Sequence, residues 1–178
     1  EGSVVVTNSL MFSNGGSVIT DGASSYDSPE NEAALEQYAK LATFAPTGVA
    51  ATCEQDAVSR FTAGKAAMLL SGSWQQDTMK TAVDFDWRIA VPPTPTGDTF
   101  VGALGGFNLG VSAKAKNPEL AFKWIEFLTT PENQEAVNSL IPALKSAGAT
   151  FVEANRQQPE VVLETLENGA TRPASPMY

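Results

Sequence analysis

Helix starts are the feature that most constrains this chain, because the same short pattern recurs along it. A residue that can cap a helix is followed by proline and then glutamate, which suits the N-cap, the first helical position and the positive end of the helix dipole. Apolar residues follow at helical spacing. A fourth segment opens with Gln-Pro-Glu and ends before Gly169, a residue suited to helix termination. The pattern predicts helices that begin at 28–30, 117–119, 130–132 and 158–160.

Short apolar runs lie between these helices and are typical of buried strands. We predict strands at 66–70, 86–93 and 107–113, whereas 3–6 fits either a strand or the end of a helix. Strands that alternate with helices indicate an α/β fold with a largely covered sheet. The Pro- and Thr-rich stretch 92–99 is the strongest linker signal, and we place a crossing between two lobes there.

Composition excludes several classes of function. A net charge of −9 disfavours nucleic acid as a partner. The chain has no His, so the commonest general base and metal ligand are missing, and Cys53 is alone. No apolar run approaches the roughly 18 residues of a membrane span. The start at Glu1 reads as a cut or processed end.

The segment 61–76 contains the most informative aromatic residue. Gly64 is placed to end a helix, Gly72 permits a tight turn, and Ser73 is placed to cap the next helix. Trp74 would then lie in a first helical turn, beside free backbone N–H groups. An indole there can stack on the apolar face of a sugar. The alternative, equally supported by the pattern, is a core tryptophan that seals a strand end.

A second segment, 102–111, is rich in glycine and precedes a predicted strand. It does not have the spacing or the strand-to-helix context of a dinucleotide or phosphate loop. Two interpretations of this segment stay open: a place where a ligand approaches the backbone, and a simple bend between the lobes. Acidic pairs such as Asp84 with Asp86 lie in polar stretches and fit solvated faces better than a glycosidase pair. Trp124 falls on the apolar stripe of its helix, which predicts a core position.

Taken together, these motifs resemble the family 1 extracellular solute-binding proteins, the maltose-binding-like receptors of bacterial ABC importers. The stretches that carry the resemblance keep the order of the family. They are the Gly-Gly turn, hairpin and helix of 11–41, the segment 61–74, the segment 102–137 and the Arg-Pro segment of 168–178.

The resemblance implies an α/β periplasmic-binding-protein type II architecture, with two lobes joined by a hinge. It also implies that the chain is incomplete, mostly the C-terminal lobe. Residues 1–97 are expected in the second lobe, 98–150 in the hinge crossing and first lobe, and 151–178 in a truncated return to the second lobe. An exposed lobe face would favour self-association.

Carried over position by position, the resemblance predicts a ligand-binding set. Trp74 matches the sugar-stacking tryptophan of the family, and the others match segments close to the ligand or the hinge. The set comprises Trp74, Gly72, Ser73, Gly105, Gly106, Phe107, Asn8 and Arg172.

The resulting hypothesis is a non-catalytic receptor that binds a carbohydrate in a cleft and needs neither cofactor nor metal. Its partners would be a mono- or oligosaccharide and a membrane permease, and its location would be periplasmic or at the bacterial surface, free or as a lipoprotein. Three alternatives stay open. They are a relative with a non-sugar ligand such as a glycerophosphodiester, a glycosidase, and a purely structural domain.

Overall fold

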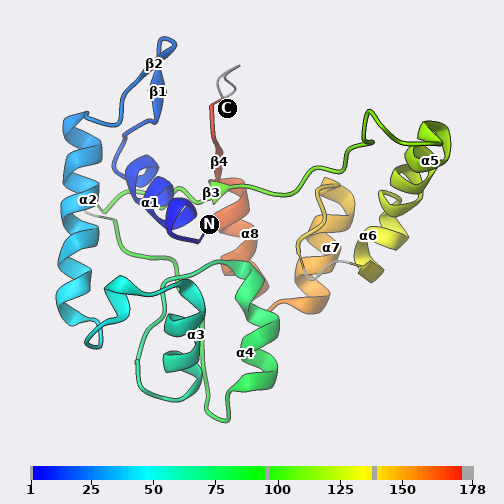
Figure 1. The fold of residues 1–178 in the computed structure, drawn as a ribbon. Helices are drawn as coiled ribbons and strands as arrows, with labels where there is room; N and C mark the ends of the chain where they lie inside the picture. The colour runs from blue at the N-terminus through cyan, green and yellow to red at the C-terminus, as the bar shows by residue number, and fades with distance from the viewer. Residues whose placement is uncertain (1, 95–96, 138–139, 174–178) are drawn as a thin grey trace.

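The computed structural model describes residues 2–94, 97–137 and 140–173, and helices dominate it. In Figure 1, α2 and α5 stand on opposite sides of the molecule, with α1, α4 and α8 between them. Of the two short strand pairs, β1–β2 forms a hairpin, and β3–β4 joins segments far apart in the chain. The elements are α1 (Gly2–Ser13), β1 (Ile19–Thr20), β2 (Ala23–Ser24), α2 (Pro29–Leu41), α3 (Glu54–Thr62), α4 (Gln76–Ala82), β3 (Ala103–Leu104), α5 (Pro118–Leu128), α6 (Pro131–Val137), α7 (Lys145–Asn155), α8 (Pro159–Glu167) and β4 (Ala170–Thr171).

The predicted helix starts are confirmed, and Ser28 and Asn117 cap their helices as predicted. The Ser28 hydroxyl accepts a hydrogen bond from the backbone N–H of Asn31 (3.3 Å), and the Asn117 side chain accepts one from Leu120 (3.0 Å). These bonds satisfy donors that the first turn of a helix leaves without partners. The segment 3–6, left open by the sequence, is helical and belongs to α1.

The end of α3 also follows the prediction. Gly64 takes a left-handed conformation (φ 67°), and its N–H bonds to the carbonyl of Phe61 at 2.9 Å. The N–H of Lys65 reaches back to the carbonyl of Arg60 at 2.8 Å. This pair of bonds is the Schellman arrangement, which glycine adopts without the steric cost of a side chain.

The core between α1 and α2 includes a small hairpin held by one buried amide. The turn of the hairpin has positive φ at Asp21 (52°) and Gly22 (78°), as a type I′ turn requires. The side-chain nitrogen of Asn31, on α2, donates to the carbonyls of Ser17 (2.7 Å) and Ser25 (2.8 Å). The hairpin is therefore fastened to α2 at both of its ends. The apolar residues of this core are Leu10, Met11, Val18 and Ala34, with Val6, Phe12, Ile19 and Tyr38 packed against them.

The three predicted strands are wrong. In the described residues, the only paired strands are the two-residue pairs β1–β2 and β3–β4, and 66–70, 86–93 and 107–113 run as irregular chain. A strand needs a neighbour to satisfy its backbone. In 86–93 side chains do this instead, because Gln157 donates to the carbonyl of Trp87 (2.6 Å) and Gln158 accepts from the N–H of Ile89 (2.7 Å). The predicted lobe crossing at 92–99 lies partly outside the described residues, at 95–96.

The parallel pair β3–β4 is what the structure retains of the predicted α/β pattern, and α1 fixes its position. The Ser9 hydroxyl accepts from the N–H of Ala103 (2.8 Å), and the Ser13 hydroxyl accepts from the N–H of Val101 (2.8 Å). The two serines are four residues apart, so they lie on one face of α1. Their hydroxyl groups accept hydrogen bonds from backbone N–H groups on one edge of the segment 101–104, while β4 pairs with β3 in the same segment.

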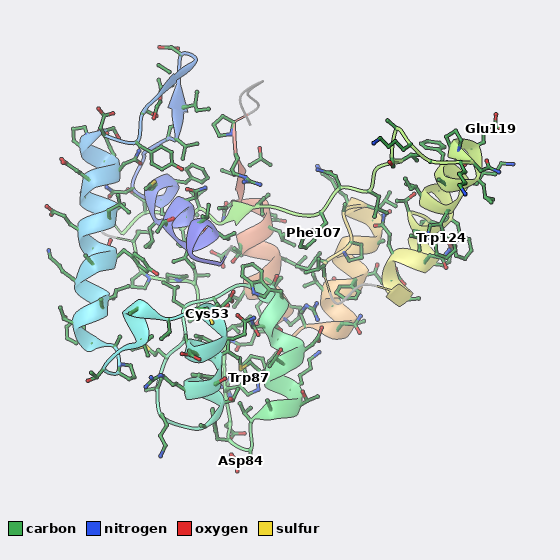
Figure 2. The ribbon with its side chains drawn as sticks, viewed as in Figure 1. Cys53, Asp84, Trp87, Phe107, Glu119 and Trp124 are labelled. Atoms are coloured by element: carbon green, nitrogen blue, oxygen red, sulfur yellow. The ribbon has the colours of Figure 1, made fainter. Side chains whose placement is uncertain are left out.

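Helix α5 presents its apolar side chains to the outside, which corrects the prediction for Trp124. That side chain is 58% exposed, and its ring stacks on Phe127 with 5.4 Å between ring centroids. Figure 2 shows it on the outlying helix α5. The core position of Trp124 was predicted only from the helical spacing of the apolar residues of α5. Among the described elements, α6 is the helix that packs against α5. In the described part of the chain, no helix is long and apolar enough to cross a bilayer.

We predict that Asn31→Ala lowers the free energy of unfolding by about 2 kcal/mol, because two partly buried carbonyls lose their donor. Asn31 is fully buried (0% exposed). The control is Asn133→Ala, which removes a more exposed bond to the carbonyl of Phe127 (2.7 Å) and should cost about 0.5 kcal/mol. Urea titration measures both. Equal effects of the two substitutions would contradict the role given to Asn31.

Candidate functional site

A cavity of about 300 Å³ lies among α1, α3, α4, α8 and the irregular segments near 69–76, 87–92 and 100–104. Its volume is at the lower end of the range typical of small-molecule sites. Aliphatic side chains make up most of its wall, together with several aromatic rings and polar side chains. The aromatic members are Phe61, Trp74, Trp87 and Phe100, and the polar members include Ser9, Ser71, Ser73, Gln75, Gln76, Arg88 and Thr165.

The turn at 71–76 forms one continuous part of this wall. A single 3-10 turn, Ser73–Gln75, leads directly into α4, and Gly72 occupies the N-cap position, so the predicted cap by Ser73 is wrong. Gly72 has extended backbone (φ −114°), a conformation that any residue can adopt. Glycine is required here because there is no room for a side chain. A Cβ atom built on Gly72 would lie 2.0 Å from Cζ3 of Trp74. Only glycine lets the indole ring lie this close to the backbone.

Glu54, the first residue of α3, holds this turn from the opposite side. It follows Cys53, which Figure 2 labels. Its Oε1 accepts hydrogen bonds from the Ser71 hydroxyl (2.6 Å), the Trp74 indole nitrogen (3.0 Å) and the Gln75 amide (3.3 Å). Hydrogen bonds to an ionised acceptor are stronger than neutral ones. One carboxylate oxygen therefore fixes three side chains of the turn at once.

The electrostatics of Glu54 reflect these contacts. Partial burial raises the pKa of Glu54, but the hydrogen bonds from Ser71, Trp74 and Gln75 together outweigh it and hold that pKa below its usual value. The carboxyl group is therefore ionised at neutral pH, and it acts as an acceptor only. In this state it holds its three hydrogen-bond donors in place.

The segment 156–158 supports the facing wall. The Gln76 side chain accepts from the N–H of Gln157 (2.9 Å), which ties the start of α4 to the connection between α7 and α8. Arg156 is buried, with Nη1 3.0 Å from the Asp77 carboxylate and its guanidinium carbon 4.8 Å from the centre of the Phe151 ring. With the bonds from Gln157 and Gln158 described above, this segment places Trp87 and Ile89 at the cavity.

Three predicted site residues, Trp74, Gly72 and Ser73, lie together on the cavity wall. Trp74 is partly buried, so its ring is neither sealed in the core nor fully in solvent. Trp74 is therefore not a fully buried core residue, because part of its side chain faces the cavity. Its ligand-binding role stays a prediction.

The other predicted site residues do not line this cavity. Gly105 and Gly106 follow β3 and have open space around them, and Phe107 is 79% exposed. Asn8 is 1% exposed on α1; within the described residues its Oδ1 has no hydrogen-bond partner. Arg172 is exposed, directly after β4. These five positions are not brought together with Trp74.

Sequence reasoning missed Glu54. It lies 17 residues before Ser71, and the intervening chain contains a helix and an irregular segment. The available signal was an acidic residue in the first turn of a helix that ends at Gly64, and that pattern usually means only a favourable helix dipole. Among the described residues, no group of three or more His, Cys, Asp or Glu side chains is placed to hold a metal ion.

Comparison with known proteins agrees with the resemblance found in the motifs. A sequence model of the bacterial extracellular solute-binding proteins matches residues 2–135, which is most of the chain. The chain belongs to this family. The family has a periplasmic-binding-protein fold, and the described residues show more helix and less sheet than we predicted from that fold.

Two curated relatives of this solute-binding protein extend the comparison. The maltodextrin-binding protein MdxE of Bacillus subtilis is 28% identical over 119 residues, which cover 65% of this chain and 28% of MdxE. An uncharacterized ABC transporter extracellular-binding protein of Pyrococcus horikoshii is 30% identical over 142 residues, which cover 72% of this chain and 30% of that protein. The chain thus spans less than a third of the length of these relatives.

We predict that Glu54→Gln flattens the acid dependence of stability. A depressed pKa contributes stability above the unfolded value of about 4.3, and that stability is lost as pH falls through the folded pKa. Wild type should therefore lose its free energy of unfolding more steeply than the variant below about pH 5. Urea titrations between about pH 3 and 7 measure this. Parallel pH profiles would show that the Glu54 contacts do not persist in solution.

Proposed function

We propose that this chain forms part of the carbohydrate site of a non-catalytic receptor that serves an ABC importer. The observation that carries the proposal is the position of Trp74 on the wall of the 300 Å³ cavity. Membership of the family supports the receptor role, and the likeness to a maltodextrin-binding protein supports a sugar ligand.

The chemistry of the cavity fits a sugar. An aromatic ring removes the C–H face of a sugar from water, and the polar side chains nearby meet its hydroxyl groups. The mixed lining, with aromatic rings beside serine and glutamine side chains, offers both kinds of contact. No proton transfer is required of any group in this binding mode. The receptor therefore needs neither a catalytic residue nor a cofactor.

The remaining parts of the proposal follow from the family. We infer two lobes that close over the ligand by a hinge motion, with 1–97 and 151–178 in one lobe and 98–150 in the crossing and the other lobe. Closure presents a surface that a membrane permease recognises. The site of action is the periplasm or the outer face of the bacterial membrane. Gly105, Gly106, Phe107, Asn8 and Arg172 are proposed to belong to the hinge and cleft of this assembly.

We predict that Trp74→Ala weakens the binding of maltotriose about 30-fold, since one buried aromatic face contributes on the order of 2 kcal/mol. The control is Trp124→Ala, which removes an exposed indole on α5, a helix that contributes no residue to the cavity wall. Isothermal titration calorimetry measures both affinities. Equal affinities of wild type and Trp74→Ala would exclude Trp74 from the site, and the absence of binding to any member of a sugar panel would overturn the carbohydrate proposal.

A further inference from the structure

The contacts of Glu54 point to a role in ligand recognition that goes beyond holding α3 in place. We propose that Glu54 is a positioning residue. Its hydrogen bond to the Trp74 indole nitrogen orients the indole so that the aromatic ring faces a ligand in the cavity. This inference rests on the proposed function. Its basis is the 3.0 Å bond from the indole nitrogen to Glu54 Oε1.

The hydrogen-bonding capacity of the indole makes this arrangement selective. An indole has one donor and no acceptor, so the bond to Glu54 uses its entire capacity. A ligand that meets Trp74 therefore meets an apolar ring and no available N–H group. Hydroxyl recognition is left to other polar groups in the lining, such as Gln76 and Thr165.

The indole is held at two separate places. Its nitrogen is bonded to Glu54, and its six-membered ring lies against the backbone of Gly72, where a Cβ would come within 2.4 Å of three ring carbons. The neighbours of Trp74 are fixed by the same carboxylate oxygen, through Ser71 and Gln75. The ring is thus ordered before a ligand arrives, which reduces the entropy lost on binding.

A purely structural role of Glu54 predicts different behaviour. Glu54 lies in the first turn of α3, where any negative charge favours the helix dipole. Charge alone would then be important, and aspartate would replace glutamate well. A positioning role depends instead on the length of the side chain and on an acceptor oxygen at its end, so glutamine would replace glutamate better than aspartate.

The test compares Glu54→Gln with Glu54→Asp in calorimetric titrations with maltotriose. We expect affinity within about 2-fold of wild type for Glu54→Gln, and a loss of about 5-fold for Glu54→Asp, as for one lost hydrogen bond. The control is Asp56→Ala, which removes an exposed first-turn charge of the same helix and should leave affinity unchanged. Near-wild-type binding by Glu54→Asp with a loss in Glu54→Gln would overturn the inference.

A double-mutant cycle separates this inference from the proposed function. If Glu54 acts through Trp74, Glu54→Asp should have no further effect on affinity in a Trp74→Ala background. Independent, multiplying effects would overturn the positioning role and leave Trp74 in the site. If Trp74→Ala alone leaves maltotriose affinity unchanged, Trp74 is not part of the site, and the inference fails; the carbohydrate proposal itself fails only if no sugar of the panel binds.

Discussion

A single carboxylate oxygen holds in place the turn that carries Trp74 on the cavity wall. Oε1 of Glu54 accepts from Ser71, Trp74 and Gln75, and thereby joins the start of α3 to the turn that precedes α4. No strand pairing connects these two segments in the described residues. The orientation of Trp74, and with it the shape of the cavity wall, depends on this carboxylate and on the missing side chain at Gly72.

Polar side chains also hold other segments of the structure in place, there by bonding to the backbone. Asn31 fastens the hairpin to α2, Ser9 and Ser13 hold the segment 101–104 against α1, and the glutamines at 157 and 158 hold the chain at 87–89. In each case a polar side chain satisfies backbone groups that a longer sheet would otherwise satisfy. Precise placement of the cavity wall therefore depends on individual hydrogen bonds and not on extensive sheet structure.

The sequence predicted the starts of α2, α5, α6 and α8 because their signals are local, whereas α7 was not predicted. Ser28, Asn117 and Gly64 act on backbone groups within a few residues, so their caps could be read without knowledge of the tertiary structure. The strands failed because an apolar run becomes a strand only when a partner lies beside it, which is a tertiary property. The sequence left Trp74 open between a ligand-facing and a core position, and its bond to Glu54 joins positions 20 residues apart and left no local signal.

The central claim is that a sugar contacts the ring of Trp74 while the indole nitrogen stays bonded to Glu54. Nuclear Overhauser effects in labelled protein with maltotriose test it most directly, with the Trp74 resonances assigned from the Trp74→Ala spectrum. The account predicts contacts between sugar C–H protons and the ring protons of Trp74, and an indole N–H that stays protected from exchange with water. Sugar contacts confined to other residues, or an indole N–H that bonds to the sugar, would contradict it.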